Sequence, residues 1–401
     1  MSASFPLAKL TFLIAILTAV GQMTQTMYVP SIGHMAGEFL VSASSLQAVM
    51  ACYLIPYGLS QFVYGTLSDR LGRKPIIIAG LLIYIVGTLV ALFAHQFEWF
   101  LIGSFIQGLG IGCGGAMARI LTRDCFDGAE LHRANSLISM CILFSPLVAP
   151  LLGGYLTESF SWRSSYLFLA LFGIAVVITM MTSMMETLPA EKRKHEPVTK
   201  SYQYVLSDKR FQGFLICLVA TFAGVGVIEA AAGVLLGGVL GLPATTVSLL
   251  FIIPIPGYLI GSGLSSYIAQ RRSMRRALNV GLVAIFIGSA VVLIPGLFGL
   301  TTALTLIGGA TIYFLGAGIL FPAATTGAIS PFPYHAGTAG ATLGGMQNLG
   351  AGIATLLASL FPAHNQMPLG ILMMAMSIIA MLGLRWVNRT PDHSNQLPQV
   401  I

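Results

Sequence analysis

Residues 65–75 read GTLSDRLGRKP, a short charged connection between apolar segments at about 46–67 and 75–95. Each segment is long enough to cross the hydrocarbon core of a bilayer, which takes about 20 helical residues. The stretch therefore indicates a membrane protein in which two consecutive spans are joined by a short charged loop.

The composition of the whole chain supports this interpretation. Of 401 residues, 56% are hydrophobic and 8% are charged, whereas about a quarter of the residues in a soluble domain are charged. The 20 basic and 13 acidic residues cannot coat a soluble protein of this size, so lipid must be the solvent for most of its surface. Soluble enzymes and nucleic-acid-binding folds are excluded, and we expect no nucleic acid partner despite the net charge of +7.

Apolar stretches of spanning length occur in two sets of six, separated by a polar stretch at 186–210. The first set lies at about 10–32, 46–67, 75–95, 98–121, 136–157 and 164–185. The second set lies at about 211–235, 245–268, 277–298, 301–322, 336–361 and 367–387. The sequence predicts an all-α integral membrane protein with 12 transmembrane helices.

The positions of the basic residues test this count, because Lys and Arg accumulate in cytoplasmic loops. With the N-terminus inside, 19 of the 20 Lys and Arg residues fall on the cytoplasmic side or at its boundary, and only Arg163 faces out. We expect a multi-pass protein of the bacterial inner membrane with both termini in the cytoplasm.

Two sets of six spans predict two pseudo-symmetric six-helix bundles related by an axis along the membrane normal, with a substrate site between them near mid-depth. The expected division is an N-terminal bundle at 1–186, a cytoplasmic linker at 187–210, a C-terminal bundle at 211–389 and a cytoplasmic tail at 390–401. Pairs of glycines four residues apart, such as Gly108 with Gly112 and Gly257 with Gly261, favour close packing of these helices.

The loop at 65–75 matches the pattern G-x-x-[SA]-D-R-x-G-R-K-P of the major facilitator superfamily, in the same place between spans two and three. The stretches at 161–163 and 149–154 resemble its drug:proton antiporter branch, although Ala149 replaces the usual Gly. The stretches at 21–30, 117–119 and 331–340 are similar to EmrD-type multidrug transporters. This resemblance covers nearly the whole chain and implies a multidrug antiporter.

Two positions depart from the wider antiporter branch. Ser104 stands where an Arg of span four is often found, and Thr26 stands where an acid of span one is often found. Neither side chain can carry the coupled proton, so another group must do so. The EmrD-type branch shares both absences, which therefore favour that branch.

The loop at 65–75 is predicted to act as a cytoplasmic latch. Gly65 lets one helix end approach another, and Asp69 can accept hydrogen bonds or pair with an Arg, which stabilises one closed state of the gate. Arg119 is the expected partner of Asp69, by resemblance and by depth. The latch also includes Arg70, Gly72, Arg73 and Lys74. For its three basic residues, binding of anionic lipid headgroups is the alternative.

Glu229 is the one acid that falls inside a predicted span, near the middle of span seven. A carboxylate at that depth costs about 2.5 to 3.5 kcal/mol on insertion scales. The low dielectric disfavours the ionised form, so Glu229 can bind a proton from outside and lose it toward the cytoplasm. We expect it to carry the coupled proton and to pair with cationic substrates. The alternative is a protonated Glu bonded to a neighbouring helix.

Polar and aromatic residues on several spans are expected to line a central cavity, because Gln is unfavourable in lipid. Tyr53, Tyr57 and Gln61 recur at helical spacing and share one face. Aromatic walls suit varied apolar or cationic ligands. The predicted substrate-binding residues are Gln22, Gln25, Thr26, Tyr28, Tyr53, Tyr57, Gln61, Glu229, Phe251, Tyr258, Tyr313, Phe314, Gln347 and Asn348.

The sequence therefore predicts a proton-coupled multidrug efflux antiporter that exports amphipathic, often cationic compounds by alternating access. We expect a functional monomer with no metal and no cofactor, whose partners are small-molecule substrates, protons and membrane lipids. Export of one endogenous metabolite and ligand sensing without transport are the alternatives. The sequence contains no HExxH or other catalytic motif that would favour an enzyme.

Overall fold

The computed structural model describes residues 7–126, 128–188, 199–332 and 335–390, and this part of the chain is helical without strands. A bilayer requires this, because every backbone N–H and C=O at membrane depth must be paired within the protein. The predicted basic residues Lys192, Arg193 and Lys194, and nearly all of the tail, lie outside the described residues. So do Pro333 and Tyr334, and the side chain of Arg133.

The first set of helices ends before the linker. Two short 3-10 turns, η1 (Val29–Ser31) and η2 (Ala43–Leu46), lie between its first helices. Its helices are α1 (Leu7–Thr26), α2 (Ile32–Phe39), α3 (Gln47–Leu71), α4 (Arg73–Leu92), α5 (Phe97–Cys125), α6 (Gly128–Ser159) and α7 (Trp162–Ser183).

The second set follows the short helix α8 (Thr199–Ser207), which lies in the predicted linker. Its first helix continues into a π-helical turn, η4 (Val234–Val239). Its helices are α9 (Lys209–Gly233), α10 (Ala244–Ile252), α11 (Pro254–Arg271), α12 (Met274–Leu297), α13 (Ala303–Ile329), α14 (Ala336–Ser359) and α15 (Met367–Arg389).

The predicted twelve spans are confirmed. Within the described residues, ten segments are long and apolar enough to cross a membrane. The long helices α6 and α14 occupy the two remaining predicted positions, which brings the number to twelve. Span eight differs from the prediction because it consists of two helices, α10 and α11. The interruption falls at Ile253, directly before Pro254, whose ring leaves no backbone N–H to donate, while Ile253 itself keeps helical dihedral angles.

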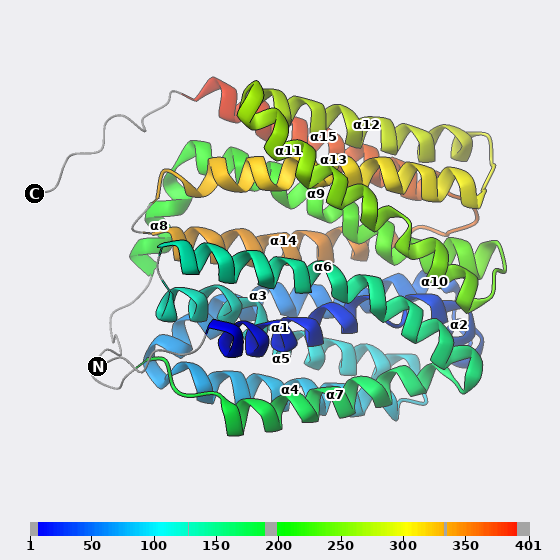
Figure 1. Ribbon diagram of the computed structural model, residues 1–401. Helices are drawn as coiled ribbons and strands as arrows, with labels where there is room; N and C mark the ends of the chain where they lie inside the picture. Colours follow the sequence, from blue (N-terminus) through cyan, green and yellow to red (C-terminus); the bar gives the residue numbers. More distant parts are fainter. Residues whose placement is uncertain (1–6, 127, 189–198, 333–334, 391–401) are drawn as a thin grey trace, which may run out of the picture.

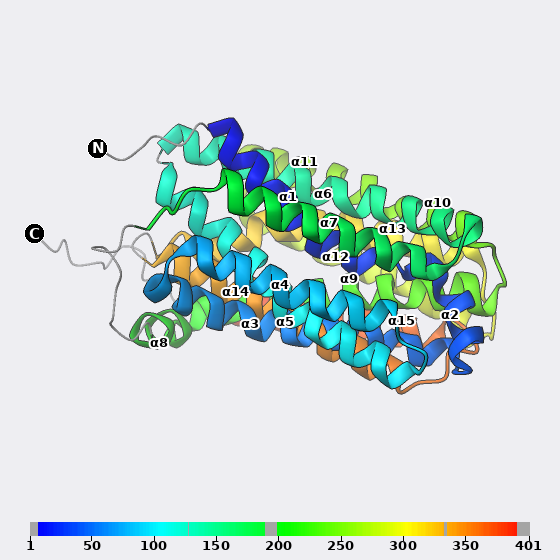
Figure 2. The same ribbon diagram turned by 90° about the horizontal axis from the view of Figure 1, so that it is seen from below.

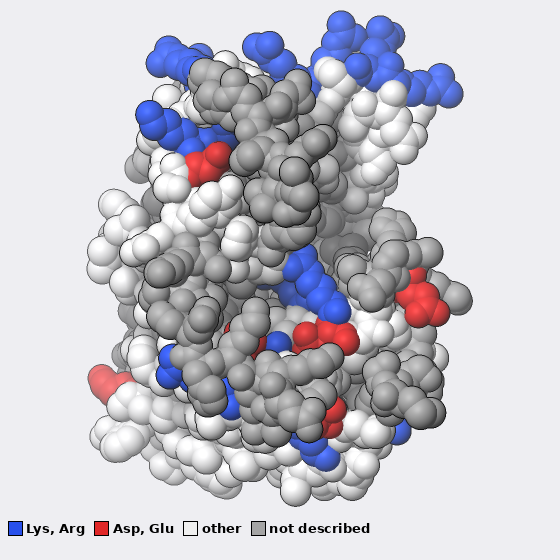
Figure 3. Space-filling view, turned by 90° about the vertical axis from the view of Figure 1, so that its left-hand side faces the viewer, with Lys and Arg blue, Asp and Glu red and all other residues white. Residues whose placement is uncertain are grey.

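The helices lie side by side along one direction, with α1–α7 below α9–α15 in Figure 1. Each set has its own main hydrophobic core. The view from below shows α8 at the same end as the start of α1 (Figure 2). We call this end, which also carries the loop at 65–75, the α8 end. Lys and Arg side chains gather on it (Figure 3).

Equivalent helix pairs in the two sets pack through the same glycine spacing. Gly80 of α4 faces Gly110 of α5, and a Cβ atom on Gly80 would lie 2.7 Å from the Gly110 carbonyl oxygen. Seven residues further along α4, Gly87 meets Gly103 of α5 in the same way. The pair α12 and α13 repeats this arrangement at Gly281 with Gly316 and at Gly288 with Gly309. Close backbone packing at small residues is typical of helix pairs in membranes.

A test of this packing compares two neighbouring glycines on α13. A Cβ on Gly309 would lie 2.8 Å from the Gly288 carbonyl oxygen, whereas one on Gly308 would meet nothing within 4 Å. We expect Gly309→Ala to cost about 1–3 kcal/mol through overpacking and to lower the melting temperature of the detergent-solubilised protein. Gly308→Ala is the matched control and should melt like the parent protein. Equal melting temperatures for the two variants would contradict the proposed packing.

Candidate functional site

Two connected cavities lie between the two sets of helices. The central cavity has a volume of about 210 Å³ and is lined from α1, α6, α9, α10, α11, α13 and α14. A second cavity of about 490 Å³, which we call the vestibule, is lined by residues of α1, α3, α5, α9, α13 and α14, several of them at the α8 end. Gln22, Phe222 and Gln347 line both cavities, so the vestibule leads into the central cavity.

Contacts between the two sets close the opposite end, where α2 and α10 lie. The carboxylate of Glu158 on α6 accepts hydrogen bonds from the backbone N–H and the hydroxyl of Thr245 on α10, at 2.9 and 3.1 Å. The Ser248 hydroxyl of α10 donates to the carbonyl oxygen of Pro150 on α6 at 2.8 Å. The cavities are therefore bounded at this end and extend toward the α8 end.

Glu229 lies in the wall of the central cavity, where α1 of the first set meets α9 of the second. Its Oε2 atom accepts a hydrogen bond of 2.7 Å from Nε2 of Gln25. The residue is 9% exposed, and the surface it keeps faces the cavity rather than lipid. This position places an ionisable carboxyl on the boundary between the two sets, as the sequence argument requires for proton exchange.

Most of the predicted cavity residues do line one of the two cavities. The central cavity and the vestibule together contain Gln22, Gln25, Tyr57, Gln61, Glu229, Phe251, Tyr258, Phe314, Gln347 and Asn348. The polar stripe of α3 reaches the vestibule through Tyr57 and Gln61. Aromatic rings and amides thus surround a mostly apolar space.

Four predicted cavity residues line neither cavity: Thr26, Tyr28, Tyr53 and Tyr313. All four are buried, and three of their hydroxyls are satisfied by nearby backbone carbonyls. Tyr53 donates to Gly21 at 2.8 Å, Thr26 to Gln22 at 3.1 Å and Tyr313 to Thr221 at 3.5 Å. In this conformation they do not line the cavities, and their contact with substrate stays a prediction.

Two phenylalanines of the cavity wall were missed from the sequence. Phe222 of α9 and Phe321 of α13 meet edge to face with ring centroids 6.0 Å apart, and Tyr258 lies 6.1 Å from Phe321. Phe222 lies two helical turns before Glu229 on α9, so the two side chains share one face of the helix. The expected position of Glu229 in the cavity could therefore have predicted that Phe222 lines it too. Among the described residues, no group of three His, Cys, Asp or Glu side chains can hold a metal ion.

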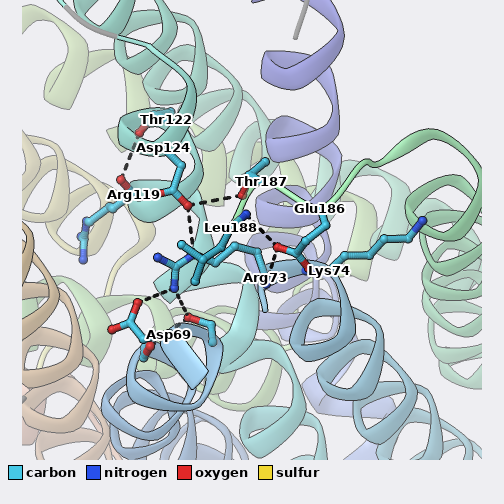
Figure 4. Close-up of polar contacts among 11 residues, drawn as sticks. Asp69, Arg73, Lys74, Arg119, Thr122, Asp124, Glu186, Thr187 and Leu188 are labelled. Carbon is cyan, nitrogen blue, oxygen red and sulfur yellow. Dashed lines mark hydrogen bonds and ion pairs between the residues drawn. The ribbon is translucent and has the colours of Figure 1, made fainter. Parts of the chain in front are cut away.

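Arg73 is the centre of a polar network at the α8 end (Figure 4). Its side chain is 7% exposed and forms ion pairs with Asp69 at 2.6 Å and with Asp124 at 2.9 Å. It also donates to the Ser68 hydroxyl at 2.7 Å. These contacts join the ends of α3, α4 and α5.

The carboxylate of Glu186, which follows α7, caps the first turn of α4. It accepts hydrogen bonds from the backbone N–H groups of Arg73 and Lys74 at 2.9 and 3.1 Å, and a carboxylate is favoured at a helix N-terminus. Gly72 precedes α4 with φ at 103°, a left-handed conformation that favours glycine. The sequence argument did not assign roles to Asp124 and Glu186, although both are acids at span ends close to the basic loop.

Two expectations for the latch are wrong in this conformation. Asp69 pairs with Arg73, while Arg119 reaches across to the second set and donates to the Gly340 carbonyl oxygen at 2.8 Å. In Figure 4 a dashed line joins Asp69 to Arg73, and none joins Asp69 to Arg119. A Cβ on Gly65 would meet nothing within 4 Å, so this glycine mediates no close helix approach here.

Twelve spans in two sets around a shared, mostly apolar cavity that contains an ionisable carboxyl are typical of a membrane transporter. The chain belongs to the Major Facilitator Superfamily, whose profile matches residues 14–355, and the resemblance inferred from its loop is confirmed. It is 41% identical over 374 residues to Multidrug resistance protein D of Escherichia coli (strain K12), covering 93% of this chain and 94% of that protein. It is 28% identical over 376 residues to Multidrug resistance protein MdtL of E. coli O139:H28, covering 90% and 91%.

Solved structures share the fold. A partially occluded inward open conformation of the xylose transporter XylE from E. coli superposes with a TM-score of 0.73 at 14% identity, over 96% of this chain and 98% of that chain. The human organic anion transporter MFSD10 gives a TM-score of 0.68 at 16% identity, over 96% and 100%. At these identities the likeness concerns architecture alone.

A double-mutant cycle tests the partner of Asp69. Combining Asp69→Asn with Arg73→Gln should show a coupling of about 0.5–1 kcal/mol, because the two side chains form a partly exposed ion pair. Combining Asp69→Asn with Arg119→Gln should be additive. The measurement is chemical unfolding in detergent micelles. If the free energies of unfolding instead show coupling between Asp69 and Arg119 and additivity between Asp69 and Arg73, then Arg119 is the partner of Asp69, as the sequence predicted.

Proposed function

We propose that this protein exports amphipathic, often cationic compounds from the cytoplasm in exchange for protons. The observation that carries the proposal is the carboxyl of Glu229, which lies in the cavity between the two sets of helices and is bonded to Gln25 of the other set. Two relatives that match nearly the whole chain are multidrug resistance proteins, which agrees with the proposal.

Glu229 is suited to the role of proton carrier. It is the only acid among the described residues that line the central cavity and the vestibule. A proton moving down the membrane potential releases about 2.3 kcal/mol per 100 mV. This energy drives export when protonation of Glu229 and occupation by a cationic substrate favour opposite conformations.

The route of the substrate follows from the shape of the cavities. We assign the α8 end to the cytoplasm, because the basic residues gather there. The substrate then enters through the vestibule and reaches the rings of Phe222, Phe314 and Phe321 beside Glu229. Rocking of the two sets opens the end at α2 and α10, where the contacts of Glu158 and Ser248 must break. We propose that one chain is sufficient for this cycle.

Glu229→Gln tests the proposal in sealed proteoliposomes. Glutamine keeps the size of the side chain and a hydrogen bond to Gln25 but binds no exchangeable proton, so we expect loss of pH-driven accumulation of a cationic dye. Glu98→Gln on α5 is the matched control, because Glu98 is an exposed acid outside both cavities. Its transport should equal that of the parent protein.

The proposal fails if Glu229→Gln accumulates the dye as fast as the parent protein under the same pH gradient. Binding of the dye measured without a gradient separates lost coupling from lost folding, since a folded variant still binds apolar cations through the aromatic wall.

A further inference from the structure

Two arginines project into the vestibule from the same face of α5. Arg119 and Arg123 are one helical turn apart, and both line this cavity. Both side chains keep accessible surface in addition to lining this cavity. The two guanidinium groups therefore share one water-accessible space.

The opposite wall leaves room for these side chains. Arg119 donates to the Gly340 carbonyl oxygen of α14. A Cβ atom on Gly337, one turn earlier, would lie 2.8 Å from Nη1 of Arg123. Both arginines therefore lie against glycines of α14, at the wall of the vestibule.

No carboxylate in the described part of the chain forms an ion pair with either arginine. Asp69 and Asp124, the acids at this end of α3 and α5, are bound by Arg73 instead. Two like charges one helical turn apart destabilise each other, and Asp124, which lines a smaller cavity with both arginines, is already paired with Arg73. Arg73 shows the contrasting case, because it is satisfied by two carboxylates and a hydroxyl.

We propose that Arg119 and Arg123 form a binding site for the oxyanion group of an amphipathic ligand, a sulfate, sulfonate, carboxylate or phosphate ester. The planar guanidinium fork matches the paired oxygens of such groups. The apolar part of the ligand lies along Phe222 and Ile329, which line the same vestibule. This site differs from Glu229 in the sign of its charge and in its position. It rests on the proposed function only in that ligands enter through the vestibule.

The oxyanion can belong to a soluble amphiphile or to an anionic lipid headgroup, since both present the same chemistry. The first arm of the test uses nanodiscs of phosphatidylcholine and measures binding of decyl sulfate by calorimetry, without a pH gradient. Arg119→Gln combined with Arg123→Gln should weaken binding by about tenfold to a hundredfold. Arg271→Gln with Arg272→Gln, which removes the same charge at the exposed end of α11, should not.

Further variants control for folding and for unspecific loss. Arg119→Lys with Arg123→Lys keeps the charge without the fork and should retain part of the affinity. Binding of decyltrimethylammonium should survive in the double glutamine variant. In the second arm, added phosphatidylglycerol should compete with decyl sulfate and raise the melting temperature of the parent protein only if lipid supplies the oxyanion.

The proposal is overturned if decyl sulfate binds equally to the parent protein and to the double glutamine variant. It is also overturned if the parent protein binds no decyl sulfate and phosphatidylglycerol changes neither protein's melting temperature. The proposed exchange of cations for protons is decided separately by Glu229→Gln in a pH gradient, so either proposal can fail while the other stands.

Discussion

Hydrocarbon chains neither donate nor accept hydrogen bonds, and this constraint decides both the backbone of this protein and the places of its polar side chains. Many hydroxyls inside the spans bond to their own helix or to a neighbour: Thr24 bonds to the Val20 carbonyl oxygen and to Tyr84, and Ser289 bonds to Ser377. Glu229 has a single bonding partner on the other set, and the rest of its polar surface is served by the cavity. The cavity therefore provides an environment that suits this carboxyl.

The same constraint explains which features the sequence could predict. Long apolar runs separated by charged loops define the number of spans, and a carboxyl inside a span must avoid lipid, so Glu229 could be placed at the cavity from its position alone. The helical spacing of polar and aromatic residues on α3 also predicted that Tyr57 and Gln61 face a cavity, and both line the vestibule. These conclusions depend only on lipid being the surrounding solvent and on the period of the helix, and both can be inferred from the sequence of one chain.

The predictions for individual side chains failed where the contact depends on which helix packs against the side chain. Tyr53 shares a face with Tyr57, but Gly21 of α1 leaves space beside it and offers its carbonyl oxygen, so the phenol is used in packing. Arg119 has the depth expected for a partner of Asp69, yet Arg73 is closer in the loop and takes that carboxylate. Helical periodicity gives the direction of a side chain and leaves its neighbour undetermined.

The titratable groups of the two cavities carry opposite charges, and in the proposed exchange this difference couples protonation of Glu229 to release of a cation. With Glu229 ionised, the lining of the cavities carries two cations and one anion; with Glu229 protonated, only Arg119 and Arg123 remain charged. Charges that face one enclosed cavity are screened less by salt than charges at the surface. In the proposed exchange, a cation bound beside Glu229 loses its attraction when the proton arrives, whereas an oxyanion at the arginines is held more firmly. Protonation of one side chain thus changes the preference of the whole cavity, and a zwitterionic amphiphile would experience both effects at once.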